Sequence, residues 1–195
     1  MPGDAMACFQ QWRQAVTSAG ENTEAPVDWD AFETSIGLRL PADYKAYIDA
    51  YGVGFINRLF RVRHPMVETG AFNLLQAPEQ WDGPEDEEEY LETHLSAPPL
   101  PLGIGRDRLM LCADSDGDQL YWDTSTDDPD AWTVVLGDDD GDSWTPFDMT
   151  MVEFLLALYT NQLPELGFAR AGYVTDEIHI QRDPFKRHRV PPTGR

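Results

Sequence analysis

The chain has 195 residues, 42% of them hydrophobic, and its 35 acidic and 14 basic residues give a net charge of −21 at pH 7. This length and apolar content predict one medium-sized globular domain with a sizeable core. The acidic excess argues against binding to nucleic acid or to anionic membranes, and the sequence lacks an apolar window of the ~20 residues that a membrane span needs.

Two cysteines, Cys8 and Cys112, lie far apart in the sequence and form no CxxC motif. With no signal peptide at the start, we expect a reduced, cytoplasmic protein, with a single disulfide as the alternative. Residues 182–195 hold five basic residues and one acidic residue, so residues 1–181 carry 34 acidic and nine basic residues, a net charge of −25. This asymmetry predicts an acidic body that attracts basic partners, followed by a basic, flexible tail at 182–195.

Two helices are expected before residue 40. Apolar residues recur at helical spacing ahead of Gly20, which predicts a first helix over 5–19. Asp28 is placed to cap a second, short helix that turns its large apolar residues inward and ends at Gly37.

The stretch 40–55, LPADYKAYIDAYGVGF, predicts a third helix together with its start, buried face and end. Its proline suits the first helical position, and Gly52 suits a left-handed C-cap. Gly54 keeps the exit of the chain sterically open. One apolar stripe at i, i+3, i+4 and i+7 is formed by Tyr44, Tyr47, Ile48 and Tyr51.

The remaining chain reads mainly as strands, followed by a closing helix. A strand at 55–62 is expected to have one wet side because of Arg58, Arg61 and Arg63. Phe147 and Asp148 are expected to staple and cap an apolar helix within 150–163. Further strands are expected at 109–113, 119–123, 131–136 and 173–180, with an SDGD hairpin turn between the first two. Helices around a central, mainly antiparallel sheet define an α+β fold.

The string D-x-D-G-D occurs at 114–118 and again at 138–142. Clustered carboxylates are ligands for calcium, but an EF-hand needs glycine at its sixth position and glutamate at its twelfth. Here the glycine is fourth, and the twelfth residue counted from Asp114 is Ser125. We therefore expect tight turns and no metal or other cofactor.

The sequence predicts no catalytic residue. Gly103 and Gly105 form a lone GxG ahead of a strand, which is not the context of a dinucleotide site. No nucleophile motif is present, and the four histidines are scattered without metal-ligand spacing: His64, His94, His179 and His188.

The segment LPADYKAYIDAYGVGFIN resembles the signature of the SUKH superfamily (SMI1/KNR4 type), in which an LPxDY segment and a glycine pair follow a short helix. Residues 29–38, 101–112 and 147–155 resemble the lead-in, the central strands and the closing helix of that family. The resemblance implies an SMI1/KNR4-like single domain over 1–181, with its core at about 27–163. A long insertion at 69–98 departs from the family pattern.

Bacterial members of the family are mostly immunity proteins of polymorphic toxin systems, which bind a cognate toxin domain and silence it. Many such toxins are nucleases, which are basic because they bind phosphates. The resemblance therefore implies a non-enzymatic, toxin-neutralising protein whose acidic surface binds a basic toxin domain, as a monomer or weak dimer. The alternative is a regulatory scaffold, as in the fungal branch of the family; a calcium-binding module or a small enzyme ranks last.

We expect the acidic turns and the tryptophans beside them to form the partner-binding surface, with carboxylates that steer and aromatic rings that anchor. The alternative for each tryptophan is burial in the core. Glu85 to Glu89 is a second candidate surface, whose alternative is a solvated first turn of a helix opened by Pro84. The predicted binding residues are Asp114, Asp116, Asp118, Trp122, Asp138, Asp139, Asp140, Asp142 and Trp144.

Overall fold

A computed structural model describes residues 4–22, 24–68, 70–76, 97–115, 117–138, 143–168 and 174–182. The helices in this part of the chain are α1 (Ala5–Ala15), α2 (Trp29–Ile36), α3 (Ala42–Tyr51) and α5 (Met151–Tyr159), with 3-10 turns η1 (Pro129–Ala131) and η2 (Pro164–Leu166). The strands are β1 (Val16–Ala19), β2 (Phe55–Ile56), β3 (Phe60–Val62), β4 (Leu109–Asp114), β5 (Asp118–Asp123), β6 (Thr133–Asp138), β7 (Trp144–Phe147) and β8 (Ile178–Gln181).

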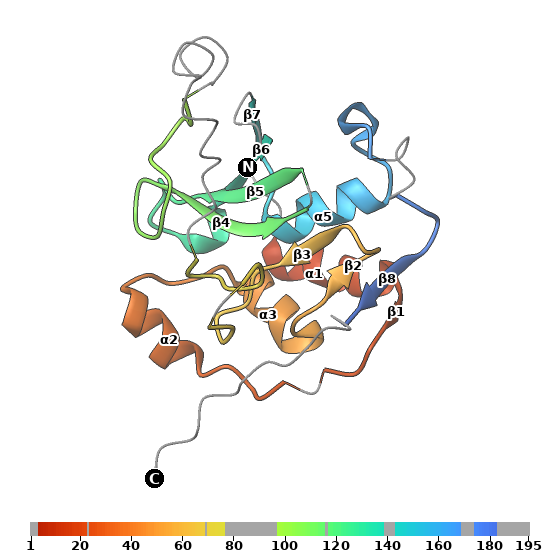
Figure 1. Cartoon of the computed structure of the whole chain (residues 1–195), viewed down its shortest axis with the longest axis horizontal. Coiled ribbons are helices and arrows are strands. Elements are labelled where there is room, and N and C mark those ends of the chain that lie inside the picture. The colour runs from red at the N-terminus through yellow and green to blue at the C-terminus, as the bar shows by residue number, and fades with distance from the viewer. Residues whose placement is uncertain are drawn as a thin grey trace, which may run out of the picture.

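The strands form one sheet in the order β1-β8-β2-β3-β4-β5-β6-β7 (Figure 1). Neighbours pair antiparallel, except that β1 and β8 pair parallel. The predicted α+β class with a mainly antiparallel sheet is therefore confirmed. The sheet takes β1 from the start of the described chain and β8 from its end.

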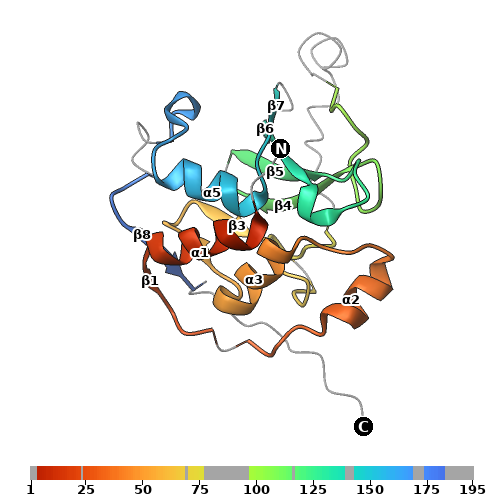
Figure 2. The ribbon, with the colours of Figure 1, turned by 180° about the vertical axis from the view of Figure 1, so that it is seen from behind.

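Helices α1, α3 and α5 cover one face of the sheet, as Figure 2 shows from that side, and α2 lies beside them. Aromatic rings join this layer. Trp12 of α1 is fully buried, and its ring centroid lies 6.1 Å from that of Tyr47 on α3 and 6.3 Å from that of Tyr159 on α5. Burial of such large rings supplies much of the apolar stabilisation of the fold.

Helix α3 confirms the local prediction for residues 40–55. The four stripe residues are buried, and the helix exits through Gly52 with a positive φ of 61°. Two details differ. Pro41 is the N-cap instead of the first helical residue, and the ψ of −141° places Gly52 outside the left-handed helical region.

The second helix and the apolar helix after residue 150 are also confirmed. Asp28 caps α2 by accepting a hydrogen bond from Ala31 N, and Gly37 ends it in the left-handed conformation. The cap of α5 is Thr150 instead of the predicted Asp148. Thr150 forms a capping box with Glu153, so the T-x-x-E signal was present in the sequence.

Three predictions that involve strands fail. The first helix ends at Ala15 instead of residue 19, because residues 16–19 pair with β8. The expected single strand at 55–62 is a hairpin, whose turn carries Asn57 and Arg58 at positive φ. Strand β7, which was not predicted, pairs with β6. The predictions for 77–96 and for the tail from 183 onward fall outside the described residues.

Candidate functional site

The fold brings the two acidic turns to the same end of the sheet. Strand β5 begins at Asp118 and β6 ends at Asp138, and these two residues face each other in the antiparallel register. The chain reaches β5 through the first D-x-D-G-D turn and leaves β6 through the second, so two sequences that lie far apart converge. Of the predicted binding residues, Asp116, Asp139, Asp140 and Asp142 lie outside the described residues.

Asp118 and Asp138 are half-exposed and locally anchored. The backbone N–H of Asp118 donates to Ser115 Oγ at 3.0 Å, and Ser143 Oγ donates to Asp138 Oδ2 at 2.8 Å. Like charges placed directly opposite on neighbouring strands repel each other.

Asp114 does not lie on this surface, which corrects the prediction for it. The residue is 3% exposed, and its carboxylate accepts hydrogen bonds in ion pairs from Arg61 and Arg63. Burial raises the pKa of Asp114, and the two guanidinium groups act against that rise. The expected wet side of the 55–62 segment is confirmed only in part. Arg58 is exposed and Arg61 is half-buried, but Arg63 is buried and donates to Asn73 O at 3.1 Å.

Trp122 is a core residue, which corrects its predicted role as a surface anchor. The side chain is fully buried, with ring centroids 4.9 Å from Tyr44 and 6.0 Å from Trp132. Trp144, on the edge strand β7, is half-exposed and packs 5.5 Å from the ring of Tyr121. Trp144 is therefore the one of these two tryptophans that a partner can reach.

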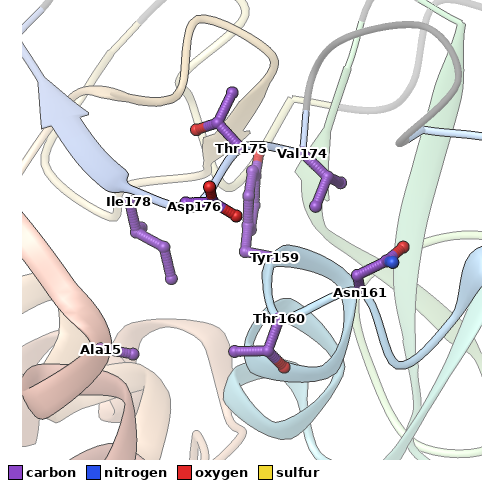
Figure 3. Close-up of a pocket in the computed structure, with 8 residues that line it drawn as sticks. All are labelled: Ala15, Tyr159, Thr160, Asn161, Val174, Thr175, Asp176 and Ile178. Atoms are coloured by element: carbon purple, nitrogen blue, oxygen red, sulfur yellow. The ribbon is translucent and has the colours of Figure 1, made fainter.

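A cavity of about 440 Å³ opens between the end of α5 and the segment that leads into β8 (Figure 3). Tyr159, the last residue of α5, stands between the two walls, and the Asp176 carboxylate lies toward its ring in this view. The polar rim is formed by Thr160, Asn161, Thr175 and Asp176. Sequence reasoning missed this cavity because no local pattern links residues 159–161 with 174–178.

A second, smaller cavity of about 260 Å³ lies between α1 and α5, with the carboxylates of Asp4 and Glu153 among its lining groups. Cys8 also lines it, and burial raises the pKa of its thiol to about 11, which makes it a weak nucleophile at neutral pH. Cys8 and Cys112 are both free thiols, so the disulfide alternative is wrong.

One exposed chain of hydrogen bonds has the composition of a catalytic triad. Ser18 Oγ lies 2.7 Å from His179 Nδ1, and His179 Nε2 lies 3.1 Å from Glu177 Oε2. The Glu177 side chain is 63% exposed, and none of the three residues lines either cavity. The arrangement therefore ties β1 to β8 at the surface of the described part of the chain.

The described residues contain no group of three or more His, Cys, Asp or Glu side chains arranged to hold a metal ion. Within the same ranges, no helix is both long and apolar enough to cross a bilayer.

These features define an α+β domain with surface cavities and with an acidic edge, by which we mean the end of β5 and β6 that carries Asp118 and Asp138. The chain belongs to the SMI1 / KNR4 family (SUKH-1), whose family model matches residues 25–157. This family includes immunity proteins, its members generally have no enzymatic activity, and protein partners are typical of it. No curated protein and no solved structure matches the chain.

Proposed function

We propose that this chain is an immunity protein that binds and silences a cognate, basic toxin domain in the cytoplasm. Family membership supports the class, and the observation that carries the proposal is the register of β5 on β6, which sets Asp118 opposite Asp138. Because Asp118 and Asp138 lie directly opposite each other, one basic surface can cover both carboxylates.

The chemistry of the partner follows from charge. A nuclease toxin grips phosphates with lysine and arginine side chains, and these groups are complementary to a body of net charge −25. Trp144, half-exposed on the edge strand β7, pairs with Gly137 and therefore lies on the opposite face of the sheet from Asp118 and Asp138, where it offers a separate aromatic contact. Binding through these groups would cover the phosphate-binding surface of the toxin. An acidic protein can inhibit a nuclease in this way without catalysing a reaction itself.

The experiment pairs this protein with the product of the adjacent gene. Co-purification and rescue of cells that express that product test the function directly. We expect Asp118→Lys with Asp138→Lys to slow association by at least about tenfold at low salt, with the difference shrinking as the Debye length falls from about 30 Å at 0.01 M to about 8 Å at 0.15 M.

The matched control is Asp30→Lys, compared with each single variant, Asp118→Lys and Asp138→Lys, because each of the three changes the net charge by the same amount and Asp28 still caps α2. Asp30 is exposed on α2, away from the acidic edge. Association rates that fall equally for the control and the edge variant, or rates that do not depend on salt, would place the binding surface elsewhere.

A further inference from the structure

The cavity at the end of α5 has two kinds of wall. Ala15, Val174 and Ile178 supply apolar surface, whereas Thr160, Asn161, Thr175 and Asp176 supply oxygen and amide groups. Among the described lining residues, Asp176 is the one that carries a charge. An apolar wall with a negatively charged rim suits a ligand that has a hydrocarbon stem and a cationic head.

The helix contributes to the same electrostatic field. Helix α5 ends at Tyr159, and a helix C-terminus carries about half a negative charge from its last carbonyl groups. The Asp176 carboxylate and this helix end lie on facing walls of the cavity (Figure 3). The cavity therefore repels anions and attracts cations from two sides.

The wall that bears Asp176 is held in place before any ligand arrives. Asn57, in the β2–β3 turn, donates through Nδ2 to Glu177 O at 3.0 Å and accepts through Oδ1 from His179 N at 2.7 Å. Thr175 Oγ1 donates to Glu177 O at 2.7 Å. Because the segment that bears Asp176 is already ordered, ligand binding does not carry the entropy cost of ordering it.

We propose that this cavity binds an arginine or lysine side chain of the partner protein. The inference rests on the proposed function for the identity of the partner, and it adds a second contact point, away from the acidic turns. The methylene stem lies along Ala15, Val174 and Ile178, and the cationic head reaches Asp176 and the carbonyl end of α5. The cavity volume of about 440 Å³ accommodates one long side chain and the backbone that carries it.

The first experiment needs no toxin. N-acetyl-arginine amide is titrated into the protein and followed by amide NMR shifts of Asn161, Thr175 and Asp176, with N-acetyl-citrulline amide as the neutral isostere. We expect saturable shifts with the arginine probe and none with citrulline. Asp176→Asn should weaken binding about three- to fivefold, as for a solvent-exposed ion pair, and Asp30→Asn should leave it unchanged.

Two results would overturn the site: equal shifts with citrulline, or equal weakening by Asp30→Asn. Saturable binding of putrescine that the arginine probe cannot displace would assign the cavity to free polyamines, which contradicts the proposal. Asn57→Gly keeps the positive φ but removes the side-chain hydrogen bonds to Glu177 O and His179 N. This variant should weaken binding of the arginine probe although residue 176 is still an aspartate.

The second experiment uses the adjacent gene product. If that protein binds and Asp176→Asn speeds its dissociation about threefold, the partner side chain enters the cavity. If it binds with a dissociation rate that Asp176→Asn leaves unchanged, the proposed function stands and this inference fails. If it does not bind while the arginine probe does, the cation site stands and the immunity function fails.

Discussion

Asp43 connects the LPADY segment to the rest of the fold through its carboxylate. Oδ1 accepts from Tyr44 N at 2.7 Å, and Oδ2 accepts from Val152 N at 3.2 Å, in the first turn of α5. The same segment is held at Ala42, whose N–H donates to Asp130 Oδ1 at 2.6 Å, and at Tyr44, whose hydroxyl donates to Arg63 O at 2.8 Å. These contacts show that the segment organises the core of the fold.

Asp43 gives the stability of the protein a testable pH dependence. Burial raises the pKa of this fully buried carboxyl above its usual value near 3.8, so the folded state binds the proton more tightly than the unfolded state does. Its contribution to stability is fully present below pH 3.8 and is lost as pH rises through the raised pKa. Each unit of difference between the two pKa values corresponds to about 1.4 kcal/mol.

We therefore expect the free energy of unfolding of the wild type, minus that of Asp43→Asn, to increase as pH falls from neutrality toward 3.8. Urea denaturation at a series of pH values measures this difference. Asp114, whose pKa burial also raises, is present in both proteins and cancels. A difference that stays flat with pH, or that declines on acidification, would show that Asp43 does not hold its proton more tightly in the folded state.

Gly54 shows how a local signal acquires its meaning from a distant element. A Cβ at this position would lie 2.6 Å from the carbonyl oxygen of Gln181, the last residue of β8. The glycine therefore lets β8 pass against β2. The sequence predicts that the chain exit at Gly54 must be open, but it does not reveal which strand passes there.

Gly54→Ala should displace β8 and lower the free energy of unfolding by about 1–3 kcal/mol, because the clashing atom belongs to backbone. Hydrogen exchange should accelerate at Asn57 and Gly20, whose amides donate to β8 carbonyls. Gly37→Ala is the matched control: its φ of +66° costs about 1 kcal/mol of strain, with no atom within 4 Å of the new Cβ. Unchanged exchange at Asn57 and Gly20 in Gly54→Ala would contradict the assigned packing.

Some helices and strands are determined by interactions within a few residues, and others by contacts with distant parts of the chain. Helices α2, α3 and α5 could be predicted because Asp28, Gly37 and the apolar stripes act within a few residues. Strand β7 follows β6 after a short turn, but its Pro146 is unfavourable in a strand and is tolerated because β7 is an edge strand. The boundary of α1 could not be predicted, because it depends on pairing with the distant strand β8. The cavity beside Asp176 depends on such pairing as well, because β8 carries one of its walls.

At the scale of the whole molecule, charge is the dominant property that composition alone provides. Composition indicates an acidic body, but it does not separate a carboxylate on the surface from one in the core. Asp114 and Asp118 belong to the same five-residue string, yet one is buried against two arginines and the other is half-exposed. The register of β4, β5 and β6 decides which aspartates a partner can meet.

The net charge of −21 predicts that salt stabilises the folded protein. Carboxylates on a compact body repel one another more than they do on an expanded chain, and added salt screens that repulsion. The thermal midpoint should therefore rise between about 0.01 M and 0.15 M NaCl, over which the Debye length falls from about 30 Å to about 8 Å. A nonionic osmolyte at equal osmolality serves as the control, and a midpoint that falls with NaCl would mean that ion pairs outweigh the repulsion.

The pairing of β1 with β8 has a consequence for how the protein is made. Residues 16–19 leave the ribosome well before residues 178–180, with which they pair. At elongation rates of roughly 5–20 residues per second, β1 waits on the order of ten seconds for its partner strand. Trp12 waits almost as long for α5, one of the two helices that bury its ring. Until β8 has been synthesised, β1 has no strand to pair with and β2 keeps one unpaired edge, so the sheet becomes complete only after residue 181 has been made.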